Sequence, residues 1–559
     1  MSERHASGAS AAELYWKEVI DEAPRTLGLM DREPLSPTAG CCDRTFWAWK
    51  FTDFPGARFQ EALCVLGFLH ATRRPDNPYW NNPRVLAWIE LGLRFWMRQQ
   101  HRDGSFDEAY PHERSLAATA FTAFYVAEAL GFCGEALDPT TRADARSALA
   151  RAGAWLCRND ETHGVLSNHL AAAAAALRHI HVLTDSRECA QRSDFFLERI
   201  VGRQSREGWY EEYGGADPGY QTHGSFYLAR IWELTGSAHL LESLQRSTAF
   251  LTHCLHPDGS LGGEYASRNT QTYYPAAFEM LAGVDDAALA IARTMRASVT
   301  NGAAACLGGI DAYNYFPLLN NLVFAYRAAS DGAAGDRSDA MMEPAPGRVW
   351  FPDAGLLRVR TACATVLVGT SKGGVVKVFS GARRALSLSD CGFLGRLHDG
   401  RLCSTQYLDR ARPTEVSDGR VVVSGFMMEC ARPTMSPFRF LAFRLFMLTV
   451  GGLPALARWL KGQLVRVLIT RRRALAITFR RTIEITPREL VVEDELAGAD
   501  LSRLAGLWRG AHFTTVHMGS SRYFIAQEIQ GTGPASGLEA VPIPRGTDRV
   551  VVRRAHPLA

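Results

Sequence analysis

The chain changes its hydrophobic pattern between Ser330 and Gly347. From Ala57 to Ser330, apolar residues recur at helical spacing in long runs separated by short polar turns, and alternating strand patterns are almost absent. Beyond Gly347, short runs of alternating apolar and polar residues are punctuated by Gly, Asp and Pro, which is typical of antiparallel strands. The pattern therefore predicts a helical part followed by a β part.

Similar polar turns recur about every 50 residues in the helical part. Each contains a glycine, and these are Gly104, Gly164, Gly208, Gly259 and, more faintly, Gly309. Two helices and their turns occupy such a period, so each repeat is expected to be a helical hairpin that buries its apolar face against its neighbours. An open solenoid or a closed ring would satisfy this burial. Because the polar turns recur at equivalent places, we predict a closed (α/α) toroid.

The same patterns give the expected domain boundaries. Residues 1–330 are predicted to form the (α/α) toroid, and residues 331–346, which are small, polar and proline-bearing, a linker. Residues 347–559 are predicted to form an antiparallel β-sandwich, because many short strands with short turns argue against a parallel sheet.

Residues 433–473 interrupt the strand pattern with two apolar helical segments, separated at Gly451, Gly452 and Pro454. The stretch contains eight basic residues and no acidic residue. Each segment is too short and too interrupted by arginine to span a bilayer. Two interpretations stay open: a helical excursion packed on the sandwich, or an amphipathic hairpin that lies in an anionic membrane surface.

Composition places the chain among soluble globular proteins and limits its partners. Of its 559 residues, 47% are hydrophobic and 21% charged, which suits two large domains. The 62 basic and 58 acidic residues leave a net charge of +4, which argues against binding nucleic acid by bulk charge. The first residues lack the continuous apolar segment of a signal peptide, and the cysteines form no CxxC pair. We therefore expect a cytoplasmic protein, peripheral to the membrane if 433–473 binds lipid.

The best candidate for a functional site is the segment Glu207–Arg230, EGWYEEYGGADPGYQTHGSFYLAR. It crowds acidic, aromatic and glycine residues into turns that lead into a helix. Tyr220 and His223 can hold or move protons. Trp209 and Glu212 of the same segment are candidate substrate contacts.

A helix predicted to begin at Asn168 carries His169 at its amino-terminal end. There, unpaired N–H groups and the helix dipole favour an anion such as a substrate carboxylate. The stretch from Gly262 to Met280 would bring Tyr265 and Arg268 to the same face, and Arg268 could bind a sugar carboxylate through both nitrogens. The alternative for Arg268 is a salt bridge with Glu264 or with another acid of the turns.

A toroid, a linker and a sandwich in that order, with an Asn-His pair and a Gly-Tyr loop about fifty residues later, resemble the heparinase II/III-like and alginate-lyase-like polysaccharide lyases. The resemblance covers most of the chain as architecture, and short motifs carry it. In that family an Asn or its equivalent neutralises a uronate carboxylate, while a His and a Tyr act as base and acid. The resemblance implies these roles for Asn168, His169 and Tyr220, with His223 as a second possible base.

The resemblance implies β-elimination on a uronic-acid-containing polysaccharide or oligosaccharide. Many members carry a His-x-His pair and a following Asp in the sandwich, whereas the corresponding stretch here, LSDCGFLGRLHDGRLCSTQYL, offers only His398 beside Asp399. We therefore expect no metal and no other cofactor. The sequence leaves the sugar, the linkage and the oligomeric state open.

Two other functions fit the same architecture. Helical toroids also host inverting glycoside hydrolases, which need two carboxyl groups several ångströms apart. The turn acids could provide such a pair, and they are Asp107, Glu108, Glu113, Glu211, Glu212 and Glu264. The other alternative is a non-catalytic, membrane-associated carbohydrate-binding or assembly factor, which the missing signal peptide and the missing sandwich His motif favour.

Overall fold

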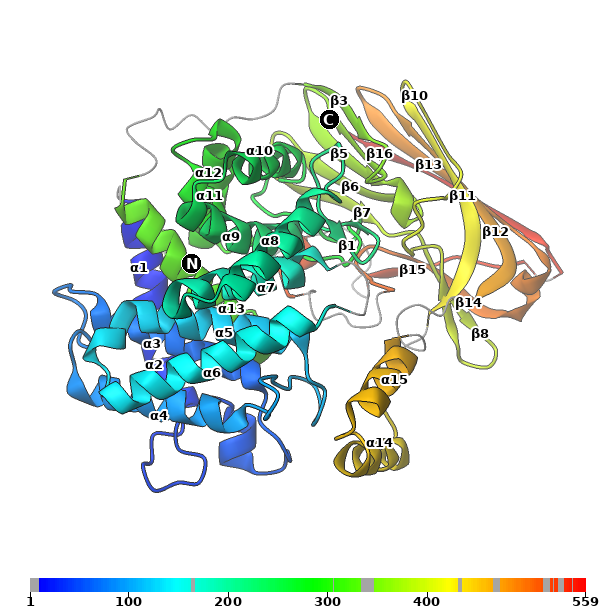
Figure 1. Ribbon diagram of the computed structural model, residues 1–559. Coiled ribbons are helices and arrows are strands. Elements are labelled where there is room, and N and C mark those ends of the chain that lie inside the picture. Colours follow the sequence, from blue (N-terminus) through cyan, green and yellow to red (C-terminus); the bar gives the residue numbers. More distant parts are fainter. Residues whose placement is uncertain are drawn as a thin grey trace.

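The structure is a computed structural model. It describes residues 10–161, 166–304, 306–332, 346–430, 435–465, 473–515, 523–525, 527–530, 537–544 and 546–558. Helices up to Ser330 and strands from Gly347 form two domains that lie side by side (Figure 1), so the predicted order of helical part and β part is confirmed. Most of the predicted linker, residues 333–345, lies outside the described residues.

The helical domain contains thirteen α-helices in its described residues. They are α1 (Ala11–Asp21), α2 (Ala23–Leu29), α3 (Ala62–Ala71), α4 (Pro83–Gln99), α5 (Leu116–Cys133), α6 (Pro139–Arg158), α7 (Ser167–Thr184), α8 (Arg187–Val201), α9 (Pro218–Thr235), α10 (Ala238–Thr252), α11 (Ala276–Leu281), α12 (Asp286–Asn301) and α13 (Ala312–Ser330). The stretch Leu116–Ala136 is long and apolar enough to cross a membrane, but 89% of its most apolar window is buried inside the protein. It is a core helix of this domain.

The helices form a closed ring. The inner helices α3, α5, α7, α9, α11 and α13 contact one another in that order, and α13 returns to α3. The outer helices α4, α6, α8, α10 and α12 pack around them. In α7 the alanines of residues 171–176 are all fully buried, because small side chains allow neighbouring inner helices to approach on every side. The predicted (α/α) toroid is confirmed.

Matching hydrogen bonds confirm the predicted repeat of polar turns. The side-chain amide of Gln100 donates to the carbonyl oxygens of Gly104 and of a residue in α6, and Gln204 donates in the same way to Gly208 and to a residue in α10. Gly104 and Gly208 have φ values of +100° and +101°, and an added Cβ would lie 2.2 and 2.1 Å from a carbonyl oxygen of the next helix. Only glycine fits these turns. Gly164 lies outside the described residues.

The β domain consists of two antiparallel sheets, as predicted. The five-stranded sheet has the order β3-β4-β5-β6-β7, and the nine-stranded sheet has the order β15-β14-β8-β9-β11-β12-β13-β16 with β10 paired to β11. The strand bounds are β3 (Gly347–Phe351), β4 (Leu356–Arg360), β5 (Ala364–Gly369), β6 (Val375–Ser380), β7 (Ala385–Asp390), β8 (Phe393–Leu397), β9 (Leu402–Ser404), β10 (Thr414–Ser417), β11 (Arg420–Cys430), β12 (Ala474–Ile485), β13 (Glu489–Ala497), β14 (Leu504–Gly510), β15 (Leu538–Ala540) and β16 (Arg549–Pro557).

The five-stranded sheet lies between the toroid and the larger sheet (Figure 1). Strand β5 shows why, because every one of its residues is buried. Leu367 joins the core shared with the toroid, whereas Val366 and Val368 join the core between the two sheets. Alternate residues of a strand point to opposite faces, so β5 fills two cores at once.

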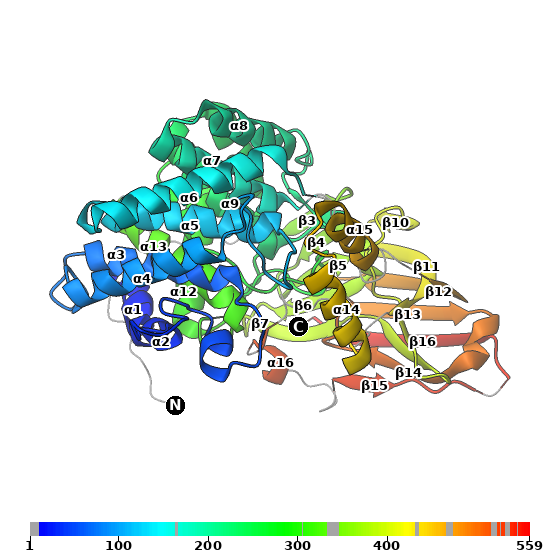
Figure 2. The same ribbon diagram turned by 60° about the horizontal axis from the view of Figure 1, so that its bottom comes forward.

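The two helices predicted within 433–473 are present as α14 (Pro437–Thr449) and α15 (Pro454–Val465). They form a hairpin that stands apart from the sheets, and Figure 2 shows it in front of the β domain. Residues 433, 434 and 466–472 of the predicted insertion lie outside the described residues. A last short helix, α16, spans Gln527–Gln530.

Candidate active site

The amino-terminal ends of α7 and α9 lie side by side and carry the main candidates. Gly224 of α9 packs so closely on α7 that an added Cβ would lie 3.4 Å from the Cα of Asn168. The fully buried Asp217 caps α9, because its side chain accepts the backbone N–H of Tyr220 at 3.1 Å and that of Arg268 at 2.8 Å. One carboxylate therefore fixes both Tyr220 and Arg268 beside the start of α9.

Asn168 and Glu212 form a buried pair, with side chains 2% and 1% exposed. The backbone N–H of Asn168 donates to Glu212 Oε1 at 2.7 Å, and its side-chain amide lies 3.0 Å from both carboxyl oxygens. Burial raises the pKa of Glu212 to about 7, although the bonds from Asn168 oppose that rise. The sequence predicted that Asn168 binds a substrate carboxylate; in the structure its amide binds the carboxyl group of Glu212.

His169 lies in the first turn of α7 and is held by Glu161. Its Nδ1 is 2.9 Å from Glu161 Oε2, and its side chain is 23% exposed, whereas that of Glu161 is 4% exposed. An ionised Glu161 accepts the Nδ1–H, so the Nε2 lone pair is left to accept a proton. A histidine oriented by a carboxylate is the arrangement of a general base. Sequence reasoning missed Glu161, which lies eight residues upstream of His169.

His223 lies in an aromatic stack next to the amino-terminal end of α7. Its ring is parallel to that of Tyr274 at 4.2 Å between centroids and to that of Phe121 at 5.6 Å, and its Nε2 is 3.0 Å from the Tyr227 hydroxyl. Phe121 also meets His169 edge to face at 5.7 Å. Burial, with the positive charge of neighbouring groups, holds the pKa of His223 well below its usual value, so the ring is neutral.

Tyr213, in the turn between the short strands β1 (Glu211–Glu212) and β2 (Gly215–Ala216), joins the candidates although the sequence did not single it out. Its φ of +53° is in the left-handed region, which non-glycine residues enter rarely. The Arg268 guanidinium lies 4.2 Å from the centre of its ring. Burial raises the pKa of Tyr213, with Arg268 opposing and Tyr220 adding to the rise.

Tyr220 also contributes to the raised pKa of two further tyrosines, Tyr274 and the β-domain residue Tyr523. Four tyrosines therefore gather here.

Two predicted substrate contacts instead lie at the contact between the domains. Tyr265 is 5% exposed, its hydroxyl is 3.0 Å from His256 Nε2, and its Cβ packs on Gly369 of β5. Trp209 is 3% exposed and lies under the Arg410 guanidinium, 5.0 Å from its ring centre. Both side chains pack against the β domain.

Glu264, one of the alternative partners predicted for Arg268, binds elsewhere. Glu264 binds two β-domain residues, with Lys377 Nζ at 2.6 Å and His512 Nδ1 at 3.2 Å. Glu264 and Lys377 are each 1% exposed. Burial would raise the pKa of Glu264, but Lys377 and His512 outweigh it and hold the pKa well below its usual value. The ion pair that the sequence offered to Arg268 therefore joins the two domains.

Most turn acids considered for a hydrolase have structural partners. Asp107 accepts two backbone N–H groups of its own turn at 2.7 and 2.9 Å, and Glu113 accepts two more at 2.8 and 3.2 Å. Glu108 lies 3.3 Å from Arg58 Nη1. These contacts hold the turns, and with Glu212 on Asn168 and Glu264 on Lys377 they engage five of the six turn acids that were considered for a catalytic pair.

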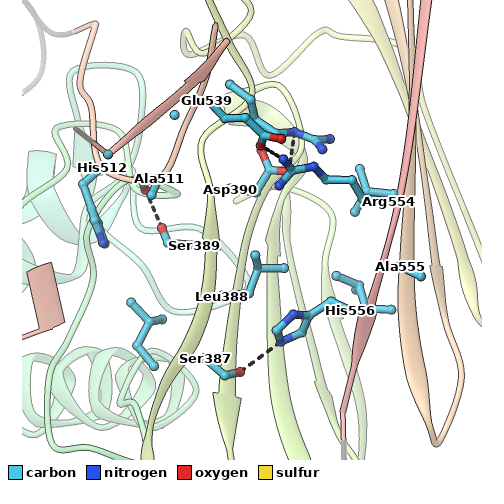
Figure 3. Close-up of a pocket in the computed structure, with 16 residues that line it drawn as sticks. Ser387, Leu388, Ser389, Asp390, Ala511, His512, Glu539, Arg554, Ala555 and His556 are labelled. Atoms are coloured by element: carbon cyan, nitrogen blue, oxygen red, sulfur yellow. Dashed lines mark hydrogen bonds and ion pairs between the residues drawn. The ribbon is translucent and has the colours of Figure 1, made fainter. Parts of the chain in front are cut away.

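A separate cavity of about 420 Å³ lies in the β domain, between β7 of one sheet and β13, β14 and β16 of the other. Figure 3 shows Asp390 near Arg554 and Glu539 at one end, and His556 with Ser387 at the other. The His556 Nε2 lies 3.3 Å from the Ser387 hydroxyl. Among the described residues that line it, none is a predicted site residue.

The wall of this cavity belongs to a buried ion network. Arg481 binds Asp494 at 2.6 Å and Asp390 at 2.9 Å, and Arg509 binds the same two carboxylates. All four side chains are at most 5% exposed. Burial opposes the ionisation of Asp390, but the two arginines lower its pKa to about 2. Two cations and two anions balance, which is the pattern of a structural network.

Within the described part of the chain, no group of three or more His, Cys, Asp or Glu side chains is placed to hold a metal ion. The absence of a metal stays a prediction from the sequence. The chemistry of the candidate site is therefore argued from its side chains.

Comparison with known proteins adds to this picture. Residues 85–294 match the family model described as the Ulvan lyase N-terminal domain, and no curated protein matches the sequence. A chondroitin AC lyase from Streptomyces coelicolor A3, solved with chondroitin sulphate, is similar in structure with a TM-score of 0.55 at 12% identity, covering 92% of this chain and 69% of that one. A Paenibacillus xanthan lyase gives a TM-score of 0.55 at 10% identity, covering 89% of this chain and 46% of that one.

At such low identity, the likeness to solved structures shows the fold alone. The match to the family model lies within the helical domain. The matched residues include Asn168, His169, Tyr220 and Arg268. Residues 85–294 thus match the Ulvan lyase N-terminal domain, and the chain as a whole has the fold of the solved polysaccharide lyases, a helical toroid followed by antiparallel sheets, as its sequence indicated.

Proposed function

We propose that this protein is a polysaccharide lyase that acts by β-elimination on a uronic-acid-containing polysaccharide or oligosaccharide. The observation that carries the proposal is the His169–Glu161 pair at the amino-terminal end of α7, beside the cluster of Tyr213, Tyr220 and Arg268. An oriented base, a phenolic acid and a cation for a carboxylate are the groups that β-elimination needs.

In the proposed reaction, His169 removes the proton from C5 of the uronate. Glu161 accepts the Nδ1–H of His169 at 2.9 Å, so Nε2 takes this proton and the imidazolium is stabilised. The electron pair of the C5–H bond forms the C4–C5 double bond, and the bond from C4 to the leaving oxygen breaks. Tyr220 donates its proton to that oxygen, and the imidazolium then returns a proton to the tyrosinate through solvent.

The uronate carboxylate has to be neutralised because negative charge builds up on it as C5 loses its proton. Arg268 supplies a guanidinium next to Tyr213 and Tyr220. Glu212, with a pKa of about 7, is half protonated near neutral pH, and an approaching carboxylate favours its protonated form. A protonated Glu212 beside Asn168 then adds a hydrogen-bond donor in place of a repelling charge.

The test is incubation of the protein with ulvan, chondroitin sulphate, xanthan, heparin and alginate. A lyase product carries the C4–C5 double bond, which absorbs in the near ultraviolet, and its mass is one water smaller than that of the hydrolysis product. Unsaturated products from at least one polymer are expected, and saturated products with a new reducing end would instead establish a hydrolase. The His169→Ala variant is the matched control, since its absorbance should rise at least about 100-fold more slowly. The cytoplasmic location stays a prediction.

A further inference from the structure

The hairpin of α14 and α15 exposes apolar side chains that no part of the described structure covers. In α14, Phe438, Leu441, Leu445 and Leu448 are 85%, 66%, 62% and 57% exposed. Their spacing of three and four residues places them on one face of the helix. A folded protein rarely leaves a continuous apolar stripe in water unless the stripe binds something.

The opposite face of α14 is packed on the helical domain. Arg444 Nε lies 3.0 Å from Asp53 Oδ2, and its guanidinium is 5.4 Å from the ring centre of Phe54. Phe443 meets Tyr110 edge to face at 5.2 Å. These contacts hold α14 against the toroid. The exposed apolar stripe of α14 therefore points away from the toroid in a fixed direction.

The exposed surface continues past the turn of the hairpin. Arg114 donates to the carbonyl oxygen of Gly452 at 3.0 Å, which ties the turn to the toroid as well. Beyond this anchor, Leu453 and Trp459 are 57% and 56% exposed. Phe51, in the loop that carries Asp53, is 93% exposed.

Charge identifies what this surface binds. Residues 437–465, which form the hairpin, contain four basic residues and no acidic residue; Arg444 pairs with Asp53 of the toroid, and Arg439 is exposed on α14. A hydrophobic groove of another protein would cover the apolar stripe but leave the excess positive charge without a counterpart. An acidic polysaccharide would meet the charge but leave the stripe in water. An anionic lipid surface meets both, because apolar side chains enter the acyl boundary while basic side chains bind lipid phosphates.

We propose that the α14–α15 hairpin docks the protein on an anionic membrane surface, with Phe438, Leu441, Leu445 and Leu448 inserted at the headgroup boundary. The anchors on Asp53, Tyr110 and the turn residue Gly452 make the hairpin a fixed extension of the toroid, so docking also sets how the toroid faces the membrane. The proposal is independent of the lyase reaction.

The test is flotation of the full chain with phosphatidylcholine vesicles, with and without phosphatidylglycerol. The protein should float with phosphatidylglycerol at low salt, bind less at high salt, and stay behind with phosphatidylcholine alone. The Leu441→Gln, Leu445→Gln double variant should bind at least about tenfold more weakly, since two inserted leucines are lost. Leu35→Gln is the matched control, because Leu35 is 93% exposed outside the hairpin, and it should bind like the unmodified protein.

A second variant keeps the test decisive if the double variant folds poorly. Arg439→Glu changes an exposed side chain and should weaken binding to phosphatidylglycerol with an unchanged unfolding temperature. The proposal is wrong if the protein fails to float at low salt, or if both variants bind as well as Leu35→Gln. It is also wrong if the protein self-associates through the stripe, so that the double variant becomes monomeric while neither form binds vesicles.

Discussion

Two of the places where the protein buries polar groups, the amino-terminal ends of α7 and α9 and the inside of the β domain, differ in how their charges are matched. In the β domain, Arg481 and Arg509 share Asp390 and Asp494, so each charge faces an opposite one. In the toroid, the hydrogen bonds to the Glu212 carboxyl group come from the neutral amide and the backbone N–H of Asn168.

The difference shows in the titration of the groups. The pKa of Asp390 falls to about 2, whereas burial raises that of Glu212 to about 7. A balanced network stabilises a fold, while buried groups that titrate near neutral pH are typical of sites that move protons. The matching of charges therefore distinguishes the structural network around Arg481 from the candidate active site. The cavity of Figure 3 lies beside the structural network.

The largest effect that this comparison predicts is on turnover. His169→Ala should lower kcat by about 10²–10⁴-fold, because it removes the general base. The unfolding temperature should fall by no more than a few degrees, since the His169 side chain is partly exposed and its removal costs Glu161 one hydrogen bond. Initial rates of near-ultraviolet absorbance together with thermal unfolding check both parts. A variant that loses stability and activity together would place His169 with the structural group.

The structural cluster should respond in the opposite way. Arg481→Met leaves Asp390 and Asp494 with one cation between them, and such a loss costs about 3–5 kcal/mol of unfolding free energy. Urea unfolding of the β domain measures this change. Turnover per folded molecule should remain that of the unmodified protein, and a selective loss of turnover at full stability would contradict the assignment.

Stability should fall as pH rises through the range in which Glu212 titrates. Its pKa is about 7 in the folded chain and near 4.5 when unfolded, so the folded state holds the extra proton between these values. Unfolding free energy should therefore decrease by about 3 kcal/mol from pH 4.5 to 7 through this group. The Glu212→Gln variant should lose that part of the pH dependence in urea titrations at several pH values. Identical pH profiles for the two proteins would contradict the raised pKa.

The smallest predicted effect concerns Glu161, which positions His169 without touching substrate. Glu161→Gln keeps an oxygen for the Nδ1–H of His169 but loses the charge that stabilises the imidazolium. Turnover should fall by about 10–100-fold while KM changes little. The turnover of Glu161→Ala, which also removes the hydrogen bond to His169, should be lower still. Equal rates for Gln and Glu would show that orientation alone matters.

Spacing along the chain was enough to predict much of the protein. The helical and alternating patterns gave the toroid, the antiparallel sheets and the α14–α15 hairpin, because each pattern reflects which face of an element is buried. The glycine turns marked the repeats for the same local reason. His169 at the beginning of α7 and Tyr220 at the beginning of α9 also followed from local signals.

Contacts between distant segments decided the rest. Tyr265 and Trp209 looked like site residues in sequence, but Gly369 and Arg410 of the β domain cover them. Glu161 and Tyr213 were missed for the converse reason: the first meets His169 only in the folded chain, from eight residues upstream, and the second has a left-handed backbone conformation that the sequence did not indicate. The pattern of apolar and polar residues determines which face of a helix or strand is buried. The packing of the two domains determines which groups each side chain contacts, and a functional site is defined by those contacts.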